Sequence, residues 1–406
     1  MQMTKRAEYK KIVSKISIPA NHKIKQKAYL QSGTLPVIDQ GQELVGGYTN
    51  DCQKQIVCDL PVIVFGDHTK NVKYINFPFC AGADGIKILK AKDDIFPKYL
   101  YYGTKFLTFC IEDKGYARHY QHIEKQELSV PPLPEQERIV AKIEELFSQL
   151  DAAVAELKSV KEKLVIYRQA VLKEAFEGKI SSRNKYDYVL DNQFRKISSR
   201  ELEKLSPIPE HWRYVYLSDL GELARGKSKH RPRNDSRLFE NGKYPFFQTG
   251  DVKSAQKELI ECEKKYGDFG LAQSKLWPQG TLCITIAANI AETCFLGVDA
   301  CFPDSIVGFT PNEAIVDKAY VRWFIEISKA QLWAFAPATA QKNINLTTLE
   351  NLIVPYCSLK EQKIIVQDIE EKISVCNNIE QTVDTALQQA AALRQNILKQ
   401  AFEGDF

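Results

Sequence analysis

One internal repeat constrains this chain more than any other feature of its sequence. Residues 135–180 and 361–406 align without a gap, so that Glu135 matches Glu361 and Gly178 matches Gly404. Identity is highest at the two ends, where EQERIV matches EQKIIV and LKEAFEG matches LKQAFEG. The segments before the two copies are similar more faintly, as in GTLPVIDQGQ (33–42) and GKYPFFQTGD (242–251). Repeats with a constant offset indicate copies of one structural unit, so the chain is organised as globule, helix, globule, helix.

Each copy has the periodicity of a long helix. It follows a proline-bearing, strand-like piece, 128–134 or 352–360, and ends at a glycine suited to a helix C-cap. Apolar residues recur at alternating steps of three and four, which is the seam of a coiled coil. The predicted seam residues are Ile139, Ile143, Leu146, Leu150, Leu157, Val160, Leu164, Ile365, Ile369, Ile379, Val383, Leu393 and Ile397. We expect the two helices to pair antiparallel along this seam.

The chain is long enough for two folded domains besides these helices. It has 406 residues, of which 44% are apolar and 26% charged, an ordinary globular composition. The predicted fold class is α+β, with two globular α/β domains separated by two long antiparallel coiled-coil helices in a pseudo-two-fold repeat. The predicted boundaries are a first globule at 1–127, a helical region at 128–180, a linker and second globule at 181–350, and a second helical region at 351–406.

No segment has the character of a signal peptide or a membrane span. The start, MQMTKRAEYKK, is polar, and no apolar run approaches the roughly 18 to 20 residues that cross a bilayer. Ten scattered cysteines without a secretion signal favour reduced thiols. Since no CxxC occurs, we expect no structural zinc site. The sequence predicts a soluble, cytoplasmic protein with no bound metal.

Positive charge is concentrated in the two globular segments. The net charge is +6 for 1–127 and +2 for 181–350, against −1 for 128–180 and −3 for 351–406. This asymmetry is expected of globules that face a polyanion, although solvated lysine-rich faces are also common. The densest group is RGKSKHRPRNDSR (225–237), called the basic segment below, and NHKIKQK (21–27) is a shorter basic stretch in the first globule. Both are predicted to contact phosphates.

One motif formally matches a nucleotide-binding loop. Residues 221–228 (GELARGKS) satisfy GxxxxGK[ST]. Such a loop needs a helix directly after it, and Pro232 leaves no room for one. GxGxxG, GxSxG, HExxH and the Asn-Pro-Pro-aromatic sequence of amino-methyltransferases are absent, and no histidine has a recognisable catalytic partner. We therefore predict no catalytic residue and no cofactor bound by this chain.

Polar residues of the globules are candidates for contact with DNA. Glutamine pairs with adenine, and arginine or lysine pairs with guanine, so such residues near the basic stretches are candidate base readers. Two polar groups at matching places before the helices, 118–120 and 341–343, are candidates for backbone or base contacts. The predicted DNA-binding residues are Lys23, Lys25, Lys27, Gln40, Gln42, Arg118, His119, Tyr120, Arg225, Lys227, Lys229, Arg231, Arg233, Arg237, Gln248, Thr249, Lys253, Gln256, Gln341, Lys342 and Asn343.

Together these motifs resemble a known family. Two variable globules, followed by VPPLPEQERIV or LKEQKIIV and by helices ending LKEAFEG or LKQAFEG, are similar to the DNA specificity (S) subunits of Type I restriction-modification systems. PEHWRYVYLSDLGELARGK (209–227) resembles the entry to a target recognition domain of that family. The resemblance covers nearly the whole chain.

The resemblance implies a function and a set of partners. In that family each globule is a target recognition domain that reads one half of a split DNA site. Because the two globules differ here, the site is expected to be asymmetric. The helices hold the domains apart and dock two methyltransferase subunits, which bind S-adenosylmethionine and methylate adenine. Restriction subunits that use ATP and Mg²⁺ then join. The specificity subunit itself is not catalytic, and the complex serves prokaryotic defence.

The first globule departs from the family pattern at its start. No tryptophan equivalent to Trp212 precedes Lys10, so a shortened N-terminal edge is expected. On the sequence alone, two other functions stay open: a scaffold with two protein-binding globules, or the specificity subunit of a related Type II system. A methyltransferase or an NTPase is a further alternative, although the motifs of the methyltransferases are missing. The sequence does not identify the bases read or the length of the unread spacer.

Overall fold

The two copies of the sequence repeat form two long helices, α4 (Leu133–Phe176) and α10 (Leu359–Glu403). The computed structural model describes residues 5–82, 85–112, 115, 117–180, 194–255, 258–334 and 343–404. The chain divides into unit 1, residues 1–160 and 382–406, and unit 2, residues 161–381. Each long helix contributes one segment to each unit.

Unit 1 begins with the first globule. Its strands are β1 (Lys5–Glu8), β2 (Val13–Ile16), β3 (Leu35–Ile38), β4 (Gly47–Thr49), β5 (Val62–Gly66), β6 (Val72–Ile75), β7 (Cys80–Ala81), β8 (Ile86–Ala91) and β9 (Glu127–Val130). Its helices are α1 (Tyr9–Ile12), α2 (Pro97–Phe109) and α3 (Tyr120–Ile123), with 3-10 turns η1 (Ala20–His22), η2 (Gln26–Ala28) and η3 (Cys52–Lys54).

Unit 2 contains the second globule. Its strands are β10 (Arg213–Tyr216), β11 (Gly221–Arg225), β12 (Tyr244–Pro245), β13 (Glu258–Leu259), β14 (Lys265–Tyr266), β15 (Leu282–Thr285), β16 (Thr293–Leu296), β17 (Ile306–Pro311) and β18 (Ile353–Tyr356). Its helices are α5 (Ser199–Leu202), α6 (Thr249–Ser254), α7 (Asp268–Ala272), α8 (Lys318–Ala334) and α9 (Leu346–Glu350), with 3-10 turns η4 (Leu217–Asp219) and η5 (Ser236–Leu238).

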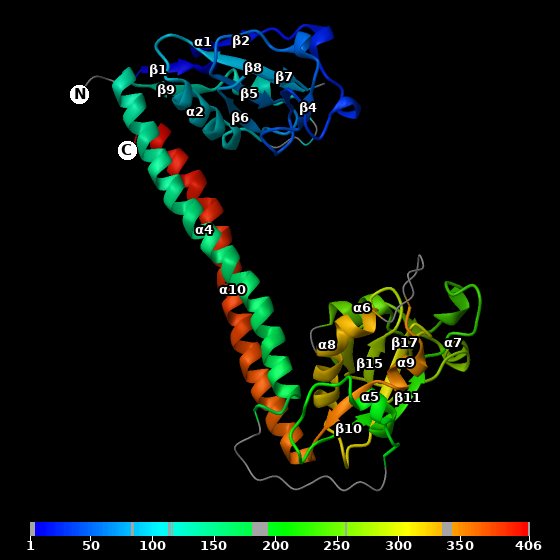
Figure 1. Cartoon of the computed structure of the whole chain (residues 1–406). Coiled ribbons are helices and arrows are strands. Elements are labelled where there is room, and N and C mark those ends of the chain that lie inside the picture. The colour runs from blue at the N-terminus through cyan, green and yellow to red at the C-terminus, as the bar shows by residue number, and fades with distance from the viewer. Residues whose placement is uncertain are drawn as a thin grey trace. The chain divides into compact units, whose positions relative to one another are not determined.

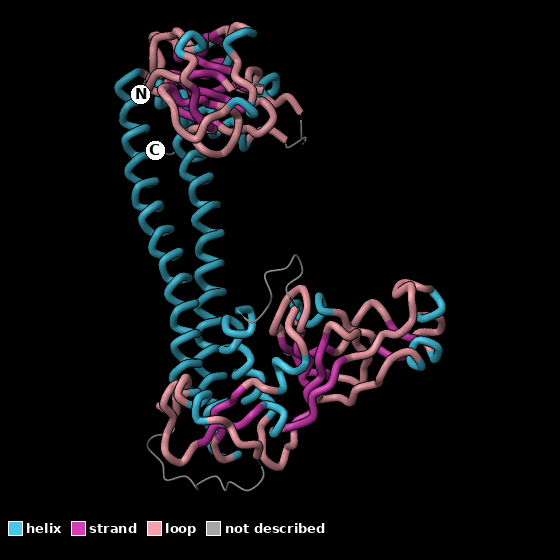
Figure 2. Tube along the Cα trace, turned by 45° about the vertical axis from the view of Figure 1, so that its right-hand side comes forward, coloured by secondary structure: helices cyan, strands magenta, loops and turns pink. Residues whose placement is uncertain are grey.

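The main sheets of the two units share one strand order, whereas the smaller sheets differ, β4-β3-β7 in unit 1 and β12-β14 in unit 2. In unit 1 the strand order is β2-β8-β5-β6, and in unit 2 it is β11-β17-β15-β16, extended by β13. Each unit also has a separate antiparallel ribbon, β1 with β9 and β10 with β18. Figure 2 shows the strands inside each globule, with shorter helices and loops around them. The repeat therefore extends from the helices into the globules, as the fainter sequence similarity predicted.

The sheet of unit 2 is buried on both faces. Alternate side chains of β15, Leu282 and Ile284, belong to one apolar cluster, whereas Cys283 between them belongs to another. The first cluster includes side chains of α8, of the end of α4 and of the start of α10, and Figure 1 shows α8 beside β15. The second includes Val252 of α6 and Trp277. Period-two alternation thus places the helical layer on one face and α6 on the other.

A glutamine at the start of each long helix ties the helix to its globule. Gln136 accepts a hydrogen bond from the Phe96 amide (2.8 Å) and donates to the carbonyls of Asp94 and Pro131. Gln362 repeats these contacts with the Asp317 amide (2.9 Å) and the carbonyls of Ile315 and Cys357. Both side chains are fully buried. The repeated glutamine in the sequence therefore has a structural cause, since a buried amide needs all its partners.

The glutamates directly before these glutamines differ between the units. Glu135 lies on the surface in a bidentate ion pair with Arg138. Glu361 is fully buried, and its Oε1 accepts hydrogen bonds from Trp212 Nε1 (2.8 Å) and His211 Nε2 (3.2 Å). Trp212 is the residue that the first globule lacks, so a partner of Glu361 is specific to unit 2.

A phenylalanine at the end of each long helix fills a core. Phe402 of α10 packs on Tyr99 and Phe106 of α2 in unit 1, with ring centroids 4.9 and 5.6 Å apart. Phe176 of α4 packs on Tyr320 and Phe324 of α8 in unit 2, at 5.0 and 5.3 Å. These are the phenylalanines of LKQAFEG and LKEAFEG, so the second repeated motif is a core anchor.

The long helices run antiparallel within each unit, side by side in both views (Figures 1 and 2). In unit 1 Arg394 of α10 binds Asp151 and lies over the ring of Phe147 (4.5 Å). In unit 2 Arg168 of α4 donates to Glu380 (2.7 Å) and to Asn377 (2.8 Å). Residues further along α4 therefore pair with residues earlier in α10, as expected of antiparallel helices.

Most predicted seam residues are buried or half-buried. The buried ones are Ile139, Ile143, Leu164, Ile365, Ile369, Val383 and Ile397. The half-buried ones are Leu146, Leu150, Leu157 and Val160. Ile379 and Leu393 are instead 40% and 49% exposed, which places them outside the buried seam. A two-helix seam buries only a narrow stripe, so a residue slightly off its axis stays in solvent.

Within the described ranges, no helix combines enough length with enough apolar character to cross a lipid bilayer. The formal nucleotide-loop match at 221–228 is a strand, β11, over Gly221–Arg225, followed by irregular backbone and not by a helix. The absence of a helix directly after this motif, predicted from Pro232, is therefore borne out.

Candidate nucleic-acid interface

The basic segment of unit 2 has a fixed backbone and outward-facing charges. Gly226 lies so close to Phe302 and Pro303 that a Cβ would meet their atoms at 2.4 Å. The Lys227 amide donates to the Phe302 carbonyl (3.0 Å), and the Lys229 amide donates to the Gln273 carbonyl (3.2 Å). The side chains of both lysines are exposed. The segment thus presents cations on a defined path, which suits a phosphate backbone.

Three arginines of the basic segment are bonded in different ways. Arg231 folds back, and its Nη1 donates to the carbonyls of Ser228 (2.7 Å) and His230 (2.9 Å). Arg233 makes one bond to Asp304 (2.8 Å). Arg237 makes a bidentate contact with Asp235. Arg225, at the end of β11, is exposed.

Asp235 is a residue that the sequence analysis overlooked. Its carboxylate binds the Arg237 guanidinium and His230 Nε2 (2.8 Å), and these bonds hold the pKa of Asp235 far below its usual value. The only sequence signal was that Asp235 is the one acidic residue in the basic segment.

A second polar group of unit 2 lies on α6. Gln248 lies directly before this helix. Its backbone amide donates to the carboxylate of Asp251 in the first turn (2.6 Å). The Gln248 and Lys253 side chains are exposed, and Thr249 is half-buried. Because Val252 of α6 packs on the sheet face opposite α8, these candidates lie on the side of unit 2 away from its helical layer.

The corresponding loop of unit 1 follows β3. Asp39 accepts from the Gly41 amide (2.9 Å) and lies 3.5 Å from Nζ of Lys73, whose side chain is only 5% exposed. Burial lowers the pKa of Lys73, opposed by the charge of Asp39. Gln42 is exposed beyond this anchor. The pair therefore positions a candidate base reader, which sequence spacing alone did not reveal.

Gln40 is less accessible than predicted. Its carbonyl accepts from Thr69 Oγ1 (2.7 Å) and Asn71 Nδ2 (2.9 Å), and its side chain is half-buried. Its Oε1 is buried without a hydrogen-bond partner among the described residues. The basic stretch of unit 1 is open, with Lys23, Lys25 and Lys27 all exposed.

Two predicted DNA contacts are corrected by the structure. His119 and Tyr120 are 1% and 3% exposed. His119 Nδ1 bonds the Asp67 carbonyl (3.0 Å), and Tyr120 packs against Phe65 with ring centroids 5.8 Å apart. Buried side chains present no surface to a duplex, so both belong to the core. Their neighbour Arg118 is exposed.

In unit 2 the matching group is only partly described. Asn343 is exposed and its backbone bridges Ala287. Gln341 and Lys342 lie outside the described residues, as does Gln256.

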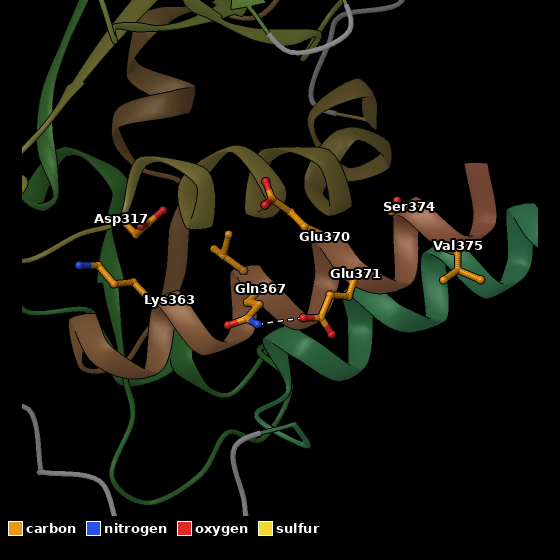
Figure 3. Close-up of a pocket in the computed structure, with 8 residues that line it drawn as sticks. Asp317, Lys363, Gln367, Glu370, Glu371, Ser374 and Val375 are labelled. Atoms are coloured by element: carbon orange, nitrogen blue, oxygen red, sulfur yellow. Dashed lines mark hydrogen bonds between the residues drawn. The ribbon is translucent and has the colours of Figure 1, made fainter. Parts of the chain in front are cut away.

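A separate groove in unit 2 runs along the start of α10. It has a volume of about 750 Å³, and Figure 3 shows Lys363, Gln367 and Glu371 on successive turns of the helix. Gln367 donates to Glu371 there (2.9 Å). The groove also includes Glu370, and none of the predicted DNA contacts lines it. Three acidic residues and one lysine line the groove, so it is not a candidate for contact with DNA.

The chain matches the Type I restriction modification DNA specificity domain over residues 10–162 and again over 209–389. It belongs to this family. The two matches follow the internal repeat, since each covers one globule and the first part of the long helix after it. The family predicted from the sequence motifs is thereby confirmed.

Curated relatives and solved structures agree with this membership. The Type I restriction enzyme EcoBI specificity subunit of Escherichia coli is 26% identical over 286 residues, covering 68% of this chain and 58% of that protein. The EcoR124I/EcoR124II specificity subunit of Escherichia coli is 22% identical over 382 residues, covering 90% and 86%. The chain thus matches little more than half the length of the first of these relatives.

Two solved structures share the fold. The HsdS subunit from Thermoanaerobacter tengcongensis aligns with a TM-score of 0.59 at 16% identity, covering 100% of this chain and 98% of that one. A chain from work on complex assembly and conformational transition of the type I R-M system aligns with a TM-score of 0.70 at 16% identity, covering 99% and 98%. The mixed helix and sheet architecture with two domains and long helices is therefore that of the specificity subunits.

Proposed function

We propose that this chain is the DNA-reading subunit of a Type I restriction-modification complex, in which each globule reads one half of a split, asymmetric site. One observation carries this proposal. The two units repeat one sheet order, yet differ in the polar side chains that they expose at corresponding places, Gln42 in unit 1 and Gln248 with Lys253 in unit 2. A repeated scaffold with different exposed readers suits two different half-sites.

The chemistry of the complex then resides in its partners. No group of three His, Cys, Asp or Glu side chains that would hold a metal occurs in the described part of the chain. Methyl transfer from S-adenosylmethionine is assigned to two methyltransferase subunits, and ATP- and Mg²⁺-dependent cleavage to restriction subunits. This chain directs those subunits to their site on DNA.

The long helices supply a surface for the methyltransferase subunits. In unit 2 the outer residues of α4, Val165, Ile166 and Tyr167, are 54%, 66% and 47% exposed. Val375 of α10, which lines the groove of Figure 3, is 57% exposed. Exposed apolar side chains on a helix are candidates for a protein interface.

The proposal is tested by mapping methylated adenine across the genome of a host without other methyltransferases. The host carries this chain together with the methyltransferase subunit of its system, and the control host carries the methyltransferase subunit alone. We expect a new motif of two short, different half-sites around a fixed gap. No new motif, with both proteins expressed and bound to each other, would contradict the proposal.

The alternative is a scaffold that binds proteins through its two globules. The salt dependence of duplex affinity distinguishes this scaffold from a DNA-reading subunit. With the methyltransferase partner bound, duplex affinity should fall by roughly a thousandfold or more between 50 and 200 mM salt, as expected for six or more phosphate contacts. Replacing Arg225, Lys227 and Lys229 by glutamine should lower the slope of log K against log[salt] by about three units. A shallow slope that the triple variant leaves unchanged would favour the scaffold.

A related Type II system uses the same kind of specificity chain. Cleavage at the methylation motif itself, with no distant cleavage, would assign the chain to such a system.

A further inference from the structure

One arginine of the basic segment is held in a single orientation. Nε of Arg237 donates to both carboxylate oxygens of Asp235 (3.2 Å each), and Nη2 donates to Oδ2 (2.7 Å). Asp235 is itself fixed, because Oδ1 accepts from the Arg237 amide (3.0 Å) and Oδ2 binds His230 Nε2 (2.8 Å). The carboxylate is therefore a rigid support for the guanidinium.

An aromatic ring completes the support. The Arg237 guanidinium lies 5.6 Å from the centroid of Phe269 in α7, and the His230 ring meets the same phenylalanine edge-on at 5.3 Å. Phe269 is 41% exposed, which is unusual for a phenylalanine and places this cluster at the surface. The side chain of Arg237 remains 63% exposed.

The outer edge of this guanidinium is open. Its bonds to Asp235 use Nε and one hydrogen of Nη2, so Nη1 and the other Nη2 hydrogen have no hydrogen-bond partner in the part of the chain described. These two groups form a planar fork of parallel donors. A fork of donors needs two neighbouring acceptors in one plane.

We propose that Arg237 reads one guanine in the half-site recognised by unit 2, through paired hydrogen bonds to O6 and N7. This inference rests on the proposed function, and it names a base that the globule reads. Guanine presents two adjacent acceptors in the major groove, whereas adenine presents one acceptor beside a donor, cytosine presents a donor, and thymine presents a single acceptor beside its methyl group. Only guanine matches a fork that has donors alone.

A phosphate also has paired acceptors. The position of Asp235 favours guanine over phosphate as the ligand of Arg237. The carboxylate next to the fork repels a phosphate and offsets the charge of Arg237, which weakens a contact that depends on charge. Guanine O6 and N7 are uncharged, so directional hydrogen bonds to them persist. Orientation by Asp235 and Phe269 also reduces the side-chain entropy lost on binding.

The other arginines of the segment lack this arrangement. In Arg231, Nη1 already donates to two backbone carbonyls, so only one of the two Nη groups is left for a base. Arg233 has a single bond to Asp304, and both partners are about half exposed. Arg233 therefore serves as a matched control, since it carries the same charge four residues away without a rigid support.

The test uses the full chain bound to its methyltransferase partner, and duplexes that carry the site found by methylation mapping. Each G·C pair of the unit 2 half-site is replaced in turn by A·T, and the ratio of substituted to cognate Kd is measured. We expect the wild-type ratio to be roughly 5- to 150-fold at one G·C pair. In Arg237→Gln that ratio should fall towards one, at that pair alone. Arg237→Lys keeps the charge and can still donate to O6 or N7 without the planar fork, so it should retain part of the ratio at the same pair.

Arg233→Gln should weaken all duplexes alike and leave every ratio unchanged. The inference is overturned if the Arg237 variants weaken all duplexes equally, which indicates a phosphate contact, or if no ratio changes. A unit 2 half-site without a G·C pair overturns it as well. A wild-type complex that binds no split site contradicts the proposed function instead, and the mapping experiment detects this before any variant is made.

Discussion

Adding one heptad to each long helix should lengthen the unread gap between the two half-sites while leaving both half-sites unchanged. Seven residues add about 10.5 Å of helix, which corresponds to up to about three base pairs of duplex. The residues to duplicate are 151–157 in α4 and 380–386 in α10. The ion pairs Asp151–Arg394 and Lys161–Glu380 bracket this stretch, so the added turns face each other. Methylation mapping of the doubly extended chain measures the new gap.

The control is a chain with the heptad added to α4 alone. Its seam loses register, because α10 then lacks two turns, and we expect loss of methylation and no shifted motif. The idea that the helices act as a ruler would be wrong if the doubly extended chain methylated sites with the original gap.

Truncating the helix-end phenylalanines should destabilise one unit each, by about 3–5 kcal/mol. Phe402→Ala removes a ring that is 3% exposed and contacts Tyr99 and Phe106, so unit 1 should lose stability. Phe176→Ala removes the ring that contacts Tyr320 and Phe324, so unit 2 should lose it. Since two units need not unfold together, stability is best measured locally.

Native-state hydrogen exchange makes that measurement. Phe402→Ala should lower protection of the β5 and β8 amides by about 100-fold or more, and Phe176→Ala should do the same for β15 and β17. Phe109→Ala is the matched control, because this phenylalanine is 50% exposed at the end of α2 and its loss should have little effect. Equal losses in both units from either variant would show that the anchors are not local.

Much of the fold could be predicted from the sequence. The long helices and most of their buried stripe follow from a short-range period, which each local stretch of sequence carries. The same period fits parallel and antiparallel pairs, so contacts such as Arg168–Glu380 were needed to show the antiparallel direction. The motif phenylalanines and glutamines were recognisable as repeated, although their roles were not. Gln136 and Gln362 bond backbone groups that no sequence pattern identifies, because any residue supplies a carbonyl or an amide.

The candidate site was predicted less completely. Exposed cations of the basic segment were found because charge density is a property of the sequence itself. His119 and Tyr120 were misplaced because polar aromatic side chains occupy cores and surfaces alike. Asp39 and Lys73 were missed because they meet across 34 positions of chain.

The sequence by itself determined that this protein is a repeat of globule and long helix, that its globules carry the positive charge, and which family it belongs to. Those properties are periodic, compositional or contiguous, so no folding is needed to see them. Only the tertiary structure decided that Trp212 supports Glu361 from 149 positions away, and that Asp235 and Phe269 together orient Arg237. Such contacts join residues from separate elements, and their distances arise only when the sheets and helices pack.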